Sequence, residues 1–307
     1  MSNRETDTRT IERRPSAFSS YHPALVLGFF TVAIVFCMCL RHPAFLAATL
    51  ICSLVFYLCV RGRSSLKALG GLAVVFAAVT FLNPLVNTQG VTVLFVCPWG
   101  WPYTLEALGY GAAIAAMFVA MLLWFGGYNH TMSSEEFTYL FGRLAPALSL
   151  VLTLVFRLVP TYQRKASELS FARTCVGKGP VGGVTSRVEQ ASTLLSALMS
   201  WAFEHGIVTA DSMNSRGYGC GRRSTYASYR FSARDARLLC VLGVSCVFLL
   251  AGLFLGGLWV EYVPAFAMAP VTGWSAVAFA AYLVFLLIPS FLNVMESVKW
   301  RVLVSRT

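Results

Sequence analysis

Residues 107–127 read ALGYGAAIAAMFVAMLLWFGG and contain no Asp, Glu, Lys or Arg. A helix needs about 20 apolar residues to cross the hydrocarbon core of a bilayer, so this stretch is long enough to span it. Inside a bilayer each backbone N–H and C=O must find a partner in the protein, and a helix satisfies them within one segment. The stretch therefore predicts a transmembrane α-helix.

The rest of the chain repeats this pattern. It is 57% hydrophobic and only 12% charged, whereas a soluble domain carries about 25% charged residues. We therefore predict an all-α, polytopic membrane protein with about six transmembrane helices. The five further segments that are similar in length and free of charge are 23–40, 44–60, 68–86, 238–260 and 274–295.

The lysines and arginines predict the orientation of these helices. If the N-terminus is cytoplasmic, all of them except Arg41 lie on the cytoplasmic side. The positive-inside rule therefore favours cytoplasmic N- and C-termini. This topology, together with anionic lipid headgroups, accounts for most of the net charge of +11, so the charge does not point to a nucleic-acid partner.

The same boundaries divide the chain into parts. Residues 1–20 are polar and of mixed charge, which predicts a disordered cytoplasmic tail. Four transmembrane helices occupy 21–127 and two more occupy 238–295. A long cytoplasmic region, 128–237, separates them, and a second tail follows at 296–307.

The region 128–237 has helical periodicity, so we predict that it is structured. Residues 146–159 are apolar but too short to span and contain Arg157; Pro160 then breaks or kinks the helix, and a second helix covers 161–174. The next helix, about 186–204, is amphipathic, Gly206 interrupts it, and a short helix leads to Arg216 and Gly217. The apolar stripe of the amphipathic helix 186–204 is Val188, Ala191, Leu195, Leu198 and Ala202.

Several kinds of chemistry find no support in the sequence. The glycines around 217–224 lack the spacing of a phosphate loop, and there is no nucleophile elbow and no HExxH motif. The four histidines are scattered, so we predict no metal site. We expect no cofactor and no catalytic residue.

Two other functions stay open at this stage. An independent permease or channel is one, although the apolar segments lack the Asp, Glu, Arg or His that ion-coupled carriers place at depth. A membrane enzyme at the inner interface is the other. It would use the charged residues Glu168, Glu204, His205 and Asp211, which are more simply read as solvated helix charges.

Three motifs, in order and spacing, resemble those of the energy-coupling factor transmembrane T components, the EcfT/CbiQ family. The resemblance covers roughly 21–300. The first motif is Asn83-Pro84 followed by Gly90 and Thr92. The second comprises Arg157, Pro160 and Glu168, with Ala172-Arg173 downstream. The third contains Ser215-Arg216-Gly217.

The resemblance implies a function and partners. In this family two cytoplasmic helices end in Ala-Arg-Gly motifs that dock on two ABC-type ATPase subunits, and a small S component binds the substrate. It therefore implies a non-catalytic subunit of a vitamin or metal-ion importer, multi-pass in a prokaryotic plasma membrane. Ala172, Arg173, Ser215, Arg216 and Gly217 match the docking motifs, and the stripe 188–202 would pack on the S component.

The first docking motif departs from the family pattern, because Thr174 replaces its glycine. A β-branched residue disfavours the left-handed conformation that closes a helix. The first docking helix is therefore expected either to run on past Thr174 or to close at Gly177.

Overall fold

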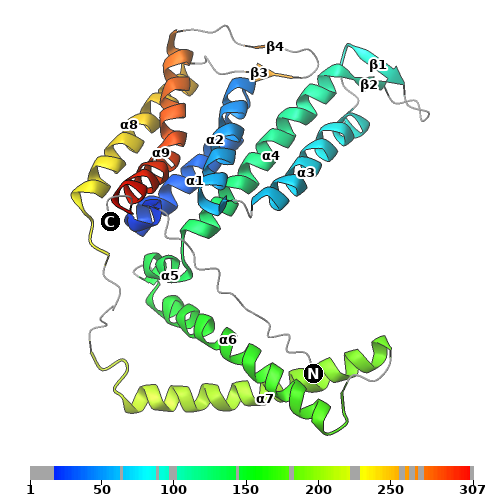
Figure 1. The fold of residues 1–307 in the computed structure, drawn as a ribbon, viewed down its shortest axis with the longest axis vertical. Helices are drawn as coiled ribbons and strands as arrows, with labels where there is room; N and C mark the ends of the chain where they lie inside the picture. Colours follow the sequence, from blue (N-terminus) through cyan, green and yellow to red (C-terminus); the bar gives the residue numbers. More distant parts are fainter. Residues whose placement is uncertain are drawn as a thin grey trace. The chain divides into compact units, whose positions relative to one another are not determined.

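The computed structural model describes residues 17–62, 65–87, 90–96, 102–142, 145–179, 183–221, 229–255, 260–262, 267–268 and 273–304. The chain divides into two compact units (Figure 1). One unit combines residues 1–133 with 229–307, and the other is the intervening segment 134–228.

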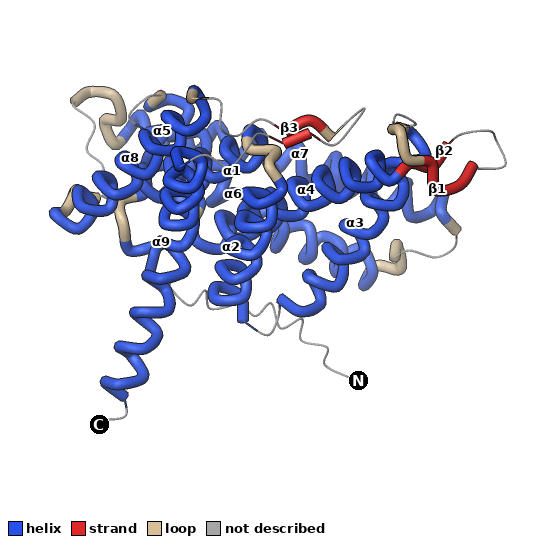
Figure 2. Tube along the Cα trace, turned by 90° about the horizontal axis from the view of Figure 1, so that it is seen from above, coloured by secondary structure: helices blue, strands red, loops and turns tan. Residues whose placement is uncertain are grey.

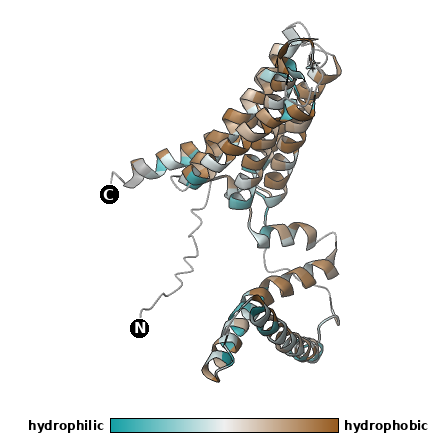
Figure 3. Ribbon diagram, turned by 90° about the vertical axis from the view of Figure 1, so that its right-hand side faces the viewer, coloured by the Kyte–Doolittle hydropathy of each residue, from teal (hydrophilic) through white to brown (hydrophobic). Residues whose placement is uncertain are grey.

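Apolar helices build the first unit, and the hydropathy colours of Figure 3 show that hydrophobic residues predominate in them. Five of those described are long and apolar enough to cross a membrane, and α1, with 17 residues, is a shorter apolar helix. All the predicted apolar segments are helices, which confirms an all-α, multi-pass membrane protein. The bounds are α1 Pro23–Cys39, α2 Pro43–Arg61, α3 Ser65–Val86, α4 Leu105–Thr131, α8 Ala233–Phe254 and α9 Gly273–Val304.

Histidine–proline pairs fix where the first two helices begin. Pro23 and Pro43 lie in the first turn of α1 and α2, where a missing backbone N–H costs nothing. The rings of His22 and His42 each accept a hydrogen bond from the backbone N–H two residues further on, at 3.2 and 3.3 Å. They thus satisfy N–H groups that have no partner inside the helix.

Aromatic side chains fill the core of this unit. Phe29 is 2% exposed, and its ring centroid lies 5.0 Å from that of Phe285, 5.4 Å from that of Phe30 and 5.7 Å from that of Trp124. Such ring pairs each add about 0.5–1.5 kcal/mol beyond the burial of their area. The cluster therefore joins α1, α4 and α9.

Two short antiparallel hairpins connect helices of the first unit. Strand β1, Val93–Val96, pairs with β2, Pro102–Thr104, between α3 and α4. Strand β3, Val260–Glu261, pairs with β4, Ala267–Met268, between α8 and α9. Figure 2 marks these strands in red.

The second unit contains α5 Ser134–Gly142, α6 Pro146–Cys175 and α7 Val184–Ser215. The interruption predicted at Gly206 is wrong, because α7 runs through it. At Pro160, where a break or a kink was predicted, the break is wrong, because α6 runs through it. The φ of proline fits a helix, although its missing N–H removes one backbone hydrogen bond. A single glycine lowers the stability of a helix by about 1 kcal/mol relative to alanine. In helices of 30 and 32 residues, the neighbouring turns outweigh these costs.

Both predicted tails contain ordered structure. Ala17–Ser20 form a short 3-10 helix, η1, and Phe18 is fully buried against Phe29. Its backbone N–H donates to Asn293 Oδ1 at 3.3 Å. At the other end, α9 continues to Val304 and turns away from the rest of its unit (Figure 3). The remainder of the predicted tails, 1–16 and 305–307, lies outside the described residues.

Candidate functional site

The two long helices of the second unit end in the same capping geometry. Gly177 and Gly217 each follow the last turn with φ +75°, which only glycine adopts without cost. At the end of α6 the Lys178 N–H donates to Arg173 O at 2.9 Å. At the end of α7 the Tyr218 N–H donates to Met213 O at 3.0 Å. Both ends are thus Schellman motifs, which give a helix a defined last turn.

The predicted docking arginines occupy different positions in these motifs. Arg216 is the C-cap of α7 and directly precedes Gly217, whereas Arg173 lies four residues before Gly177 in the last turn of α6. As Thr174 led us to expect, α6 runs on past it and closes at Gly177. Because a helix rises 1.5 Å per residue, Arg173 starts about 4.5 Å further from its helix end than Arg216 does.

Neither guanidinium is held by the rest of the described chain. The Nε of Arg173 is buried and has no hydrogen-bond partner there, and Arg216 is exposed. A buried donor without a partner is uncommon in a complete structure and costs about 1–3 kcal/mol. The flanking residues Ala172 and Ser215 are both exposed, and the Ser215 hydroxyl donates back to Asp211 O at 2.9 Å.

The helices α6 and α7 cross at their middles (Figure 1). At the crossing, the rings of Tyr162 and Trp201 pack edge to face with their centroids 5.2 Å apart. The ring centroids of Trp201 and His205 are 5.0 Å apart. His205 in turn lies 3.1 Å from the Thr209 hydroxyl. The crossing leaves the tips that carry Arg173 and Arg216 on opposite sides of it.

The predicted apolar stripe lies along α7, which has no buried residue. Val188 and Leu195 are 63% and 62% exposed. Ala191 is exposed too, whereas Leu198 and Ala202 are half-buried. An apolar surface of this extent on a helix usually marks a contact with another protein or a membrane. Other exposed apolar side chains of α7, which are not members of the predicted stripe, are Val184, Met199, Phe203, Ile207 and Val208.

The remaining motif residues of α6 are on its surface. Arg157 and Pro160 are exposed, and the carbonyl of Arg157 accepts a hydrogen bond from the Thr161 hydroxyl at 3.2 Å. Glu168 pairs with Lys165 at 3.2 Å. Because both side chains are exposed, this ion pair contributes little to stability.

The first motif meets α4 at two places. Asn83 lies where α3 crosses Gly111, and a Cβ at Gly111 would come within 2.8 Å of the Asn83 Cβ. Pro84 is buried inside α3. The Oδ1 of Asn83 is buried without a hydrogen-bond partner in the described residues. The pair thus marks a close approach of two helices.

Gly90 and Thr92 meet the start of α4. The Thr92 hydroxyl donates to Glu106 Oε1 at 2.7 Å, and its backbone N–H lies 3.1 and 3.2 Å from the two carboxylate oxygens. A Cβ on Gly90 would come within 2.6 Å of Thr104 Oγ1. The contact with Glu106 was not predicted. In the sequence Glu106 is a lone carboxylate directly before the apolar segment 107–127.

The described residues also bear on the alternative of an enzyme. Among them, no group of three or more His, Cys, Asp or Glu side chains could hold a metal ion. Glu204 and Asp211 are exposed on α7, and His205 belongs to the crossing with α6.

Comparison with known proteins identifies the family. No curated protein is similar enough to count as a relative. A family model described as cobalt transport protein, CbiQ, matches residues 20–227. The match begins at the end of η1, contains α1 to α7 and therefore covers Arg173, Arg216 and the apolar stripe. The chain belongs to the CbiQ family of cobalt transport proteins and is a multi-pass membrane component of a transport system.

Proposed function

We propose that this chain is the T component of an energy-coupling factor importer. In this role it has no catalytic residue of its own. It transmits the movement of two ABC-type ATPase subunits to a small membrane S component that binds a vitamin or a metal ion. The family match supports a transport component, and the docking role is carried by the ends of α6 and α7.

The observation that carries the proposal is the pair of capped helix ends. Each Schellman motif holds its last turn in one conformation, and each presents an arginine that its own chain leaves unpaired in the described structure. A guanidinium can donate several charge-assisted hydrogen bonds to carboxylates or carbonyls of a partner. A stiff helix then carries the partner's movement along its length.

The crossing of α6 and α7 supplies the transmission. Since Tyr162 and Trp201 pack in the middle of both helices, a movement of either tip turns its helix about this contact. The exposed apolar side chains of α7 lie along the part that would turn. We therefore assign Val188, Ala191, Leu195, Leu198 and Ala202 to contact with the S component.

Co-purification from mild detergent tests the proposal. Wild-type protein should bring down two subunits that carry the Walker A motif and one small membrane protein, as identified by mass spectrometry. Arg216→Glu should lose the ATPases, because it places a carboxylate where the partner accepts hydrogen bonds. The control is Arg187→Glu, which reverses an exposed charge near the start of α7. Equal ATPase recovery with both variants would contradict the assignment.

A further inference from the structure

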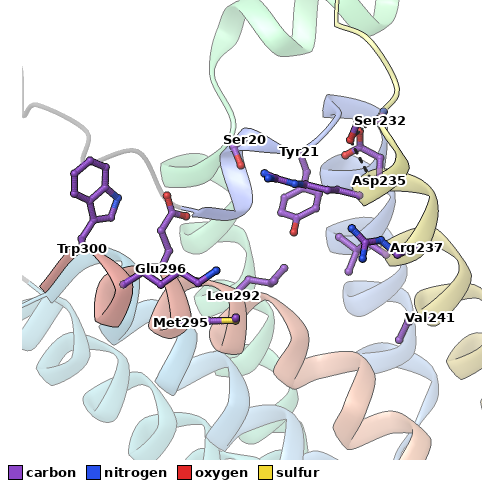
Figure 4. A pocket seen from close by; sticks show the side chains of 13 residues that line it. Ser20, Tyr21, Ser232, Asp235, Arg237, Val241, Leu292, Met295, Glu296 and Trp300 are labelled. Atoms are coloured by element: carbon purple, nitrogen blue, oxygen red, sulfur yellow. Dashed lines mark hydrogen bonds between the residues drawn. The ribbon is translucent and has the colours of Figure 1, made fainter. Parts of the chain in front are cut away.

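A cavity of about 910 Å³ opens at one end of the first unit. Figure 4 shows that three segments line it: the residues before α1, the start of α8 and the last turns of α9. Its polar and aromatic lining comprises Ser20, Tyr21, Ser232, Arg234, Asp235, Arg237, Glu296, Lys299 and Trp300. The apolar part of the lining is Leu238, Val241, Leu292 and Met295.

Asp235 is already used by the fold. Its carboxylate accepts hydrogen bonds from the N–H and hydroxyl of Ser232, at 2.7 and 2.8 Å. It also accepts one from the backbone N–H of His22 at 3.1 Å. The residue is 3% exposed, and it caps α8 while joining it to the start of α1. We therefore treat it as structural.

The other charged side chains of the cavity are available to a ligand. Arg234, Glu296 and Lys299 make no side-chain hydrogen bond or ion pair in the described part of the chain, although Glu296 and Lys299 are one helical turn apart. Arg237 uses only its Nε, which donates to the carbonyl of Ala233 at 3.3 Å. Its terminal nitrogens stay free to bind an anion.

The charges come from two helices. The start of α8 supplies Arg234 and Arg237, and α9 supplies both Glu296 and Lys299. Figure 4 shows Glu296 on the side of the cavity away from Arg237. The lining thus offers three cations and one free carboxylate to a ligand that carries one negative and one positive group.

The cavity lies at the charged ends of two candidate membrane spans. The spans Ala233–Phe254 and Gly273–Trp300 carry all their charged residues at this end, and Val241, Leu292 and Met295 are part of the cavity lining. Charged residues at the end of an apolar span are typical of the headgroup layer. Trp300 is 61% exposed, as is typical of tryptophan at a membrane interface. The positive-inside rule assigns this end to the cytoplasmic leaflet.

We propose that the cavity binds the headgroup of one aminophospholipid of the cytoplasmic leaflet, of the phosphatidylethanolamine class. The phosphodiester binds Arg234, Arg237 and Lys299, and the primary ammonium donates to Glu296. The acyl chains follow Val241, Leu292 and Met295. A choline headgroup cannot donate hydrogen bonds to Glu296, and a glycerol headgroup brings no positive charge to it. A lipid at this position would hold α8 and α9 together.

Native mass spectrometry of the full chain tests the site. The protein is offered equal amounts of phosphatidylethanolamine, phosphatidylglycerol and phosphatidylcholine with identical acyl chains. Wild type should retain one phosphatidylethanolamine in preference to the other two. Glu296→Gln should reduce the ratio of bound ethanolamine to glycerol lipid at least about fivefold, because one charge near the membrane surface is worth roughly that factor. Arg237→Gln should weaken the binding of all three phospholipids.

The matched controls are Glu189→Gln and Arg187→Gln, which remove exposed charges from α7. Both should bind lipid as wild type does. Equal binding of the three lipids by wild type, or the same ratio in Glu296→Gln and Glu189→Gln, would overturn the proposal. So would displacement of the lipid by millimolar inorganic phosphate, which would identify a site for the free anion.

A second measurement needs only the wild-type protein, in case a variant does not fold. A ligand of the native state raises the unfolding temperature. Phosphatidylethanolamine added to detergent-solubilised protein should therefore raise it more than phosphatidylcholine does. An equal rise with both lipids would contradict a headgroup site.

Discussion

Thr92 holds the carboxylate of Glu106 with both its hydroxyl and its backbone N–H, the hydroxyl at 2.7 Å from Oε1. The contact joins the chain entering β1 to the first turn of α4. It gives a physical reason for the glycine and threonine of the first family motif. Thr92 supplies the two donors, and Gly90 lets the backbone approach Thr104 and Glu106.

Gly90→Ala should disrupt this contact. The new Cβ would lie 2.6 Å from Thr104 Oγ1 and 2.8 Å from Glu106 Oε2, closer than real contacts allow, so the loop must shift. Overpacking of this kind costs about 1–3 kcal/mol. Thermal unfolding in detergent should show a lower midpoint than for wild type. Gly109→Ala is the control, because a Cβ there meets nothing within 4 Å.

Gly111→Ala should separate α3 from α4. Its Cβ would come within 2.9 Å of the carbonyl oxygen of Thr80 and 2.8 Å of the Asn83 Cβ. Because one of these atoms is backbone, α3 itself must move. Disulfide formation between cysteines introduced in α3 and α4 should slow relative to Gly28→Ala, whose Cβ has open space. An unchanged rate would show that the helices tolerate the methyl group.

ATPase binding should depend on Gly177, where α6 closes, and not on a glycine at position 174, where the predicted docking motif has Thr174. α6 closes at Gly177, where φ is +75°, and Thr174 lies within the helix with its hydroxyl donating to Ser170 O at 2.9 Å. Gly177→Ala should therefore fray the last turn, at a cost of about 1 kcal/mol, and reduce ATPase co-purification. Thr174→Gly, which restores the family residue, should not increase it. The reverse order of effects would mean that the helix closes earlier in the complex.

Trp201→Ala should loosen the crossing of α6 and α7. It removes the ring that meets Tyr162 at 5.2 Å, an interaction worth about 0.5–1.5 kcal/mol beyond its area. Spin labels at Glu168 and Glu189 should then show a broader distance distribution by pulsed electron resonance. Trp201→Phe keeps an aromatic ring at the crossing and should stay close to wild type.

Tyr282→Phe should weaken the first unit slightly. The hydroxyls of Tyr282 and Thr49 lie 2.7 Å apart in the core, and Thr49 also donates to the carbonyl of Phe45. Because Thr49 keeps that second partner, Tyr282→Phe should lower the free energy of unfolding by only about 0.5–1 kcal/mol. Tyr282→Ala should cost about 3–5 kcal/mol because it leaves a cavity. Comparable losses from both variants would mean that the hydrogen bond, not the packing, dominates.

The transmembrane helices could be predicted from the sequence because hydropathy alone determines them. Each apolar segment contains a helix, and most bounds differ from the predicted ones by at most four residues. The exceptions are α9, which extends to Val304, and α8, which begins five residues before and ends six residues before the predicted segment 238–260. The end of α6 could also be predicted, since Thr174 disfavours the left-handed conformation and Gly177 permits it. Local chemistry determines both features.

Features that depend on distant contacts could not be predicted. Glu106 and Thr92 are 14 residues apart, and only the hairpin brings them together. Phe18 lies in a polar segment, and its burial depends on Phe29 and on Asn293 near the other end of the chain. Pro160 and Gly206 were given too much weight, because the surrounding turns of a long helix decide whether it continues.

The most direct test of the proposed function is site-specific photo-cross-linking in intact cells. A photoreactive amino acid at position 216 should cross-link to a cassette ATPase, and one at position 195, on the exposed stripe of α7, should cross-link to a small membrane protein. One at position 187 serves as the control and should give neither product. Cross-linking of position 216 to lipid alone, or of all three positions to the same partners, would contradict the proposal that the tip of α7 docks on an ATPase.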